Sequence, residues 1–297
     1  ITAAGGAGWQ LAEWIVDGEP TVDMMGVDPR RFGPYATRGY LREKNEEAYA
    51  NVFTTHYPDE ERSAARPLKT APCYDRMKDL GAVFGSVYGW ERPNWFAPQN
   101  VRRRDNYSFR RSNWFEHVGN EVRATRENVG LIELSSFSKF EIEGRSAREY
   151  IDKLVANNIP KNVGGLSLVH ALNPSGSIRS EFTITRLSDG ILGEKFFVVG
   201  PGAAHNIDLD FLQKSMPKDG SVHLSDKTNQ YGVFVLAGPN ARSVLQKIAD
   251  ADISNESFKW LSMQEIPIGF CPKVRAMRVN FVGSLGWELH HPIEYQL

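Results

Sequence analysis

The chain has 297 residues, of which 41% are hydrophobic and 24% charged, proportions that exclude a disordered or fibrous protein, and its length favours two packed domains over one. Its 35 basic and 36 acidic residues give a formal net charge of -1, so no global field would recruit nucleic acid or an anionic membrane. Two cysteines are too few for a disulfide framework, and no transmembrane run or signal peptide is recognisable, which favours the bacterial cytoplasm or the mitochondrial matrix.

The chain opens on a glycine-rich segment that precedes an amphipathic helix pattern. Gly5, Gly6 and Gly8 lead into residues 9–16, whose apolar members fit one helical face, and residues 17–20 end the pattern. We expect a glycine-rich loop that feeds a helix N-terminus. Such glycines more often form a tight turn; the alternative is a cofactor cradle, in which the helix N-terminus stabilises the negative charge of a reduced flavin.

The next part of the sequence mixes linkers with short elements. A proline-containing linker reaches about residue 40 and is followed by a predicted surface helix at residues 40–50. A short helix at 74–80 and an aromatic strand at 83–88 come next. Residues 89–96, GWERPNWF, are predicted to form a loop whose aromatic rings cover another surface.

The C-terminal part alternates helices and strands without a regular βαβ rhythm. Helices are predicted at residues 116–129, 146–156, 204–215 and 240–248, and strands at 139–144, 167–172, 182–186, 195–199, 231–237 and 274–282. This mixture predicts an α+β fold with mainly antiparallel sheets.

Two carboxylates stand beside turns and are candidates for a site. Glu288 follows the glycine turn of FVGSLGWEL; it is either a surface charge paired with arginine or an acceptor of two parallel N–H donors from a ligand ring. Glu181 follows the NPSGS turn; it is either an exposed strand carboxylate or a group that stabilises an amine or iminium proton. The seven histidines show no metal-ligand spacing, so no metal is assigned.

Eight segments, taken in order, together resemble the dimethylglycine and sarcosine dehydrogenases. They cover essentially the whole chain: GGAGWQLAEWIVDGEP, DPRRFGPY, GWERPNWF, RRSNWFEHVGNE, LSSFSKFEIEG, VLAGPNARSVLQ, ISNESFKWLS and VRAMRVNFVGSLGWELH. The resemblance implies that residues 1–20 end an FAD-dependent oxidoreductase domain, 21–76 form a connector, and 77–297 form the first part of a folate-binding domain similar to the glycine-cleavage T-protein. Because the sequence starts without Met and with the end of a domain, we expect a fragment of a longer polypeptide.

The resemblance also implies functional residues. Glu288 matches the pterin-binding glutamate, and Glu181 matches the acidic residue that assists methylene transfer, so Glu181 is the catalytic candidate. Phe281 occupies a cofactor-site position where several relatives have Tyr and therefore lacks a hydroxyl there. Gly5, Gly6 and Gly8 are the candidates nearest the flavin.

The implied activity is oxidative demethylation of an N-methyl amine, dimethylglycine or sarcosine, with FAD as hydride acceptor and tetrahydrofolate as one-carbon acceptor. Dimethylglycine is slightly favoured, and an electron-transfer flavoprotein is a compatible electron acceptor. Two alternatives stay open. One is a non-catalytic regulatory subunit of the pyruvate dehydrogenase phosphatase type, and the other is an aminomethyltransferase without flavin chemistry.

Overall fold

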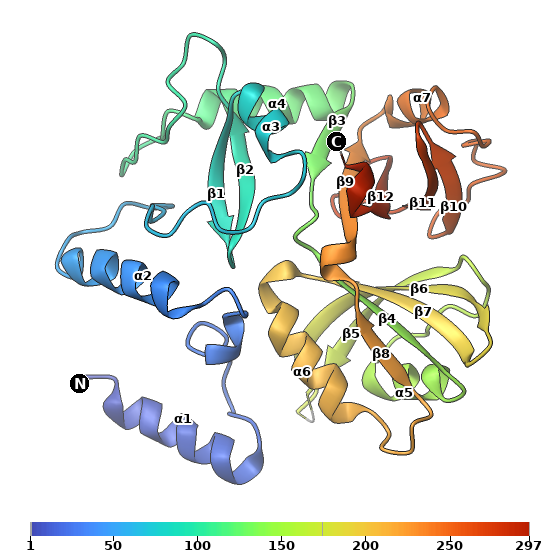
Figure 1. Ribbon diagram of the computed structural model, residues 1–297, viewed down its shortest axis with the longest axis horizontal. Helices are drawn as coiled ribbons and strands as arrows, with labels where there is room; N and C mark the ends of the chain where they lie inside the picture. Colours follow the sequence, from blue (N-terminus) through green and yellow to red (C-terminus); the bar gives the residue numbers. More distant parts are fainter. Residues whose placement is uncertain (1, 174, 297) are drawn as a thin grey trace.

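The computed structural model describes residues 2–173 and 175–296, and an N-terminal helical arm lies beside the rest of the chain (Figure 1). The arm consists of α1 (Ala4–Asp17), the 3-10 turn η1 (Pro29–Arg31) and α2 (Arg38–Ala50). Thr37 caps α2 by accepting a hydrogen bond from the backbone N–H of Tyr40, so the predicted helix at residues 40–50 is confirmed. Arg30 ties the arm to α6 (His205–Ser215) through an ion pair of 2.5 Å with Asp210.

The expected glycine-rich loop before the first helix is wrong. Gly5, Gly6 and Gly8 lie inside α1, whose N-cap is Ala3, and no atom lies within 4 Å of where a Cβ would stand at any of the three. Each glycine costs a helix about 1 kcal/mol relative to alanine. The helix persists because Ala4 and Ala7 stand among the glycines and because Trp9 donates a hydrogen bond to Glu13 one turn later.

A two-stranded hairpin connects the arm to the sheets. The hairpin consists of β1 (Ala82–Val87) and β2 (Trp90–Phe96). The helix α3 (Tyr74–Asp79) precedes it and α4 (Phe115–Glu127) follows it in the sequence. The predicted loop at residues 89–96 is therefore wrong, because these residues form β2. Tyr88 and Gly89 both adopt positive φ, as a tight hairpin turn requires, and the pairing shifts opposite Pro93, where proline cannot donate to the ladder.

Two five-stranded sheets carry the rest of the fold, and every named pairing in them is antiparallel. Sheet I has the order β10-β11-β12-β9-β3 and sheet II the order β5-β6-β7-β4-β8. Sheet I comprises β3 (Gly130–Glu133), β9 (Tyr231–Ala237), β10 (Met263–Ile268), β11 (Cys271–Met277) and β12 (Gly286–Pro292). Sheet II comprises β4 (Ser138–Gly144), β5 (Leu166–Leu172), β6 (Ile178–Gly190), β7 (Gly193–Gly200) and β8 (His223–Asp226). The predicted α+β fold with mainly antiparallel sheets is confirmed.

Helices cover the outer faces of the sheets, and the inner faces meet each other. The helices α5 (Ala147–Leu154) and α6 pack on sheet II around Phe140, Phe182 and Phe196. The helix α7 (Ala241–Gln246) packs on sheet I around Trp287. Between the sheets lies a third cluster, the inner layer, formed by residues of both sheets and by Val279 just after β11: Leu166, Phe197, Val199, Met263, Met277 and Val279.

Three further expectations about the secondary structure need correction. The strands β3, β8 and β10 were not predicted, and the strand expected at residues 274–282 ends at Met277. The chain leaves the sheet where the N–H of Val279 donates to the carbonyl of Met277, and the Asn280 side-chain oxygen then accepts the N–H of Val282 in a local turn that competes with the sheet ladder. Ser146 stands at the start of α5, where a serine at a helix start is expected to act as N-cap, but its side chain makes no cap hydrogen bond.

Candidate functional site

Alternation along β12 divides its side chains between two environments. Trp287 and Leu289 belong to the cluster under α7. Glu288 and His290 therefore point to the opposite face, toward sheet II. The ring of His290 meets Phe197 of β7 edge-on, with centroids 5.4 Å apart, which places this face of β12 against the inner layer.

Glu288 is a buried carboxylate in the inner layer and is 8% exposed. Its neighbours across the ladder are Met277 and Val235, and its Oε2 lies 3.2 Å from Nε2 of His290. Burial lowers the pKa of the fully buried His290, although Glu288 opposes the shift. The imidazole is therefore neutral at pH 7, and its Nε2–H donates to the carboxylate. Within residues 2–173 and 175–296 the carboxylate has no other hydrogen bond, so it retains acceptor capacity for N–H donors of a ligand.

Glu181 lies on the inner face of sheet II, at its solvent-exposed end. It faces His170 directly across the β5–β6 ladder, and His170 Nε2 lies 2.9 Å from Glu181 Oε2. Half of the Glu181 side chain is exposed, so the structure does not bury this carboxylate. Because period two puts Glu181 on the same face as the buried Thr185, it borders the inner layer rather than the α6 side.

The two carboxylates occupy facing walls of one layer without touching. Thr185 of β6 contacts the sulfur of Met277 at 4.0 Å, and Met277 pairs with Glu288 in the sheet I ladder. No hydrogen bond or ion pair joins Glu181 to Glu288 in the described part of the chain. The arrangement suits a ligand that donates hydrogen bonds at both of its ends, one to the buried carboxylate of Glu288 and one to the half-exposed carboxylate of Glu181.

Phe281 does not join this site. It lies in the loop between β11 and β12, its side chain is 93% exposed, and the next residue, Val282, is 76% exposed. The prediction that Phe281 contributes to the cofactor pocket gains no support from this position. The glycines of α1 are likewise exposed and contact none of the inner-layer residues.

A buried polar network beside the inner layer was missed by sequence reasoning. Lys139 is fully buried, and its Nζ donates to the carbonyl oxygen of Ser135 at 2.8 Å. Glu133 accepts from the N–H of Ser135 and from the amide of Gln296. Burial lowers the pKa of Lys139 to about 7, with Glu133 and Asp226 opposing the shift. Alternation along β4 indicated a polar face, but nothing in it shows that a second sheet covers that face.

An ion pair links the two sheets next to the same layer. Arg275 of β11 bonds Glu141 of β4 at 2.9 Å, and its guanidinium stacks on Phe197 and Tyr231 at 4.7 Å from each ring centre. Burial opposes ionisation of Glu141, but hydrogen bonds from Lys195 and Arg275 outweigh it and lower the pKa of Glu141. The inner layer therefore combines apolar packing with fixed charges at defined positions.

Neither metal ligation nor a membrane span has support in the described residues. No group of three or more His, Cys, Asp or Glu side chains in them could hold a metal ion. None of the helices found between residues 2 and 296, outside position 174, is long and apolar enough to cross a membrane.

Comparison with known families defines the class of protein. Residues 73–297 match the family described as "GCVT N-terminal domain", and residues 17–71 match the "FAD dependent oxidoreductase central domain". The chain therefore belongs to the GCVT N-terminal domain family over most of its length. More narrowly, it is a member of the dimethylglycine/sarcosine dehydrogenase family. The two matched domains follow one another in this one sequence.

The chain spans about a third of the length of the curated relatives it matches. It is 39% identical to mitochondrial dimethylglycine dehydrogenase of Mus musculus over 98% of this chain and 33% of the relative. It is 32% identical to the mitochondrial pyruvate dehydrogenase phosphatase regulatory subunit of Mus musculus, over 100% of this chain and 34% of the relative. It is 30% identical to mitochondrial sarcosine dehydrogenase of Homo sapiens, over 97% of this chain and 35% of the relative. These matches agree with the expected fragment of a longer polypeptide.

A solved structure supports the fold. The glycine cleavage system aminomethyltransferase T from Bartonella henselae superposes with a TM-score of 0.61 at 22% identity, covering 77% of this chain and 55% of that one. This confirms the predicted T-protein-like architecture. The domain boundaries at residues 20 and 76 and the binding roles of the site residues stay predictions.

Proposed function

We propose that this chain is the folate-side part of a flavin-dependent N-methyl amine dehydrogenase that acts on dimethylglycine. In the complete enzyme, the flavin domain would oxidise an N-methyl group to an iminium, and the one-carbon unit would pass to tetrahydrofolate at the inner layer. The observation that carries the proposal is Glu288, a buried carboxylate with one histidine partner and free acceptor capacity beside an apolar layer. Flavin binding is proposed for the complete polypeptide, because the described residues contain no parallel βαβ nucleotide-binding unit.

The residues of the layer fit tetrahydrofolate in their donor and acceptor types. A pterin ring presents neighbouring N–H donors, and an ionised carboxylate accepts two such bonds side by side. His290, held edge-on against Phe197, keeps the Glu288 carboxylate oriented through its Nε2–H. Tetrahydrofolate supplies the nucleophilic nitrogens that take up the one-carbon unit.

Glu181 and His170 would supply the proton chemistry. As a half-exposed pair 2.9 Å apart, they can hold a proton and exchange it with solvent. A negative charge on Glu181 would also stabilise a positively charged iminium nearby. Glu181 and His170 lie at the solvent-exposed edge of the inner layer, where they would contact a substrate that enters between the two sheets from outside.

We expect Glu288→Gln to weaken tetrahydrofolate binding about 10- to 100-fold, because the neutral amide loses charge-assisted hydrogen bonds. The measurement is a fluorescence or calorimetric titration with tetrahydrofolate under anaerobic conditions. Glu256→Gln, an exposed carboxylate without an ion pair among the described residues, is the matched control and should bind as the unaltered protein does. Equal affinities in all three proteins would remove Glu288 from the folate site.

The regulatory-subunit alternative has one observation in its favour, the 32% identity to such a protein over the whole chain. A flavin spectrum of the full-length protein separates it from the enzyme. We expect the flavin absorption to bleach on anaerobic addition of dimethylglycine, and less readily with sarcosine. A full-length protein that carries no flavin, or one whose flavin neither amine reduces, would favour the regulatory or folate-only alternative.

A further inference from the structure

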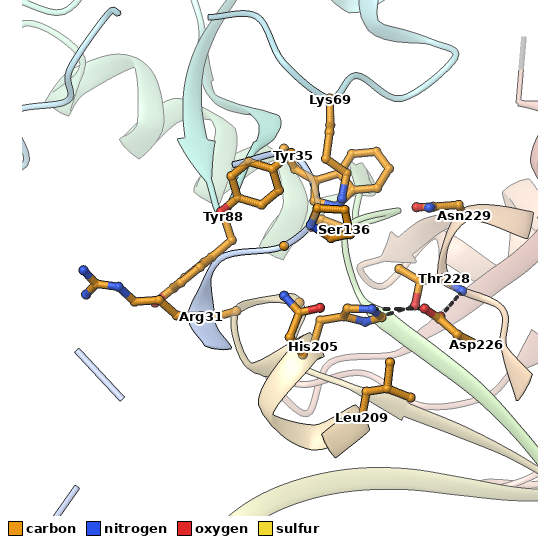
Figure 2. Close-up of a pocket in the computed structure, with 16 residues that line it drawn as sticks. Arg31, Tyr35, Lys69, Tyr88, Ser136, His205, Leu209, Asp226, Thr228 and Asn229 are labelled. Carbon is orange, nitrogen blue, oxygen red and sulfur yellow. Dashed lines mark hydrogen bonds and ion pairs between the residues drawn. The ribbon is translucent and has the colours of Figure 1, made fainter. Parts of the chain in front are cut away.

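A cavity separate from the inner layer lies where the N-terminal arm, the β1–β2 hairpin and the start of α6 meet (Figure 2). Its volume is about 310 Å³, at the lower end of the range of small-molecule pockets, about 300–1,000 Å³. Neither Glu181 nor Glu288 lines it. The proposed folate chemistry therefore leaves this cavity unexplained.

One wall of the cavity is built around Lys69. Its backbone N–H donates to Gly89 and its carbonyl accepts from Glu91, so the residue is fixed along the hairpin. Its ammonium lies over the rings of Trp90 and Tyr35, with centroids 4.4 and 5.9 Å away, and reaches into the cavity (Figure 2). The Tyr35 ring packs closely against the hairpin turn, since a Cβ at Gly89 would lie only 3.2 Å from it.

The ammonium of Lys69 has no hydrogen bond and no ion pair in the parts of the chain that the structure describes, although the Lys69 side chain is partly buried. Burial lowers the pKa of Lys69, and the charge of Asp226 opposes that shift. A desolvated cation without a directly bonded anion is costly. An anion inside the cavity would remove this cost.

The opposite wall is a preformed polar cluster. His205 stacks on Phe140 and places its Nε2 3.1 Å from Asp226, while its Nδ1 lies 3.3 Å from the Thr228 hydroxyl (Figure 2). Burial alone would raise the pKa of Asp226, but hydrogen bonds from His205 and Thr228 outweigh it and lower that pKa to about 2. The negative charge of Asp226 is thus already satisfied and does not pair with Lys69.

The start of α6 adds further positive potential. Ala204 at its N-cap provides no side-chain acceptor for the first N–H groups, and Gly202, Ala203 and Asn206 line the cavity. Arg31 stands at the rim, with its guanidinium directed away from Lys69 (Figure 2). Among the described lysines and arginines of the lining, Lys69 is the one that directs its charge into the cavity, so a ligand with a single negative charge matches the cavity better than a doubly charged phosphate.

We propose that this cavity is a second ligand site, which binds a small organic monocarboxylate. Lys69 would bond the carboxylate, and the rings of Trp90 and Tyr35 would pack against its apolar part. Because the ligand would touch the arm, the hairpin and α6 together, its binding would also stabilise their contact. The proposal uses none of the residues of the folate site.

Isothermal titration of the protein with benzoate, benzamide and inorganic phosphate tests this assignment. Benzoate should bind, its uncharged isostere benzamide should bind at least tenfold more weakly, and phosphate should bind more weakly than benzoate. Lys69→Gln should reduce benzoate affinity about tenfold or more, as loss of a charged hydrogen bond does. Lys259→Gln, an exposed lysine far from the cavity lining, is the matched control.

Three results would overturn the site: no benzoate binding at millimolar concentration, equal binding of benzamide, or unchanged affinity in Lys69→Gln. Tighter binding of phosphate would overturn the carboxylate assignment. Arg31→Gln at the rim keeps the test valid if Lys69→Gln fails to fold, because a rim change should spare the packing and still weaken benzoate binding. Unaltered benzoate affinity in a folded Arg31→Gln would then count against the positive potential inferred here.

Discussion

Replacing Arg66 with alanine should lower the free energy of unfolding by about 3–5 kcal/mol. The guanidinium bonds both oxygens of Glu91, at 2.9 and 2.7 Å, and also donates to the carbonyl of Phe84. Glu91 is 3% exposed, so removal of Arg66 leaves a buried carboxylate without its partner. The hydrogen bonds to Glu91 raise the pKa of Arg66 in spite of burial. Urea denaturation followed by circular dichroism measures the loss.

A second variant tests whether the loss of stability comes from the broken Arg66–Glu91 ion pair or from lost side-chain packing. Arg66→Met with Glu91→Leu removes both charges and should recover most of the stability, because two apolar groups need no partner. Arg42→Ala is the control: Arg42 pairs with Glu46 on the surface of α2, and its loss should cost at most about 1 kcal/mol. If the single and double variants were equally unstable, the ion pair would not be the cause.

Arg66 also shows what sequence patterns could and could not predict. The strands with clear alternation were found, and β9 was predicted with its observed bounds, because period two in an apolar run is a local property. The contact of Arg66 with Glu91 joins residues 25 apart through a hairpin whose second strand was predicted as a loop. The observed strand β2 tolerates Pro93 because the register of the β1–β2 pairing shifts between Trp95 and Pro93.

The candidate site divides in a similar way. Motif resemblance selected Glu288 and Glu181, and the structure places both on inner faces of the sheet pair. The motif resemblance could not predict the histidine partners of these carboxylates, because His170 and His290 come close to them only through strand register and side-chain direction. Phe281 was assigned to a strand by its apolar neighbours, whereas the Asn280 turn turns it into an exposed loop residue.

Substituting methionine for Lys139 should change how stability depends on pH. The pKa of Lys139 is about 7 in the folded protein and near its ordinary value, 10.5, in the unfolded chain. Between these values unfolding takes up a proton, so the free energy of unfolding rises with pH, by at most about 1.4 kcal/mol per unit. This stabilisation is complete above about pH 10.5 and is lost as the pH falls through 7.

Lys139→Met removes that dependence. At pH 7 the variant should be more stable than the unaltered protein by roughly 2–4 kcal/mol, less than the full linkage term because the hydrogen bond to Ser135 is lost. The difference should shrink toward pH 10, where the lysine is neutral when folded. Urea denaturation at several pH values gives both curves, and Lys153→Met, at an exposed position, should follow the unaltered protein. Parallel curves for Lys139→Met would mean that the buried amine keeps its charge in the fold. Glu133 and Asp226 would then offset its desolvation fully, and the polar network beside the inner layer would be a charged one.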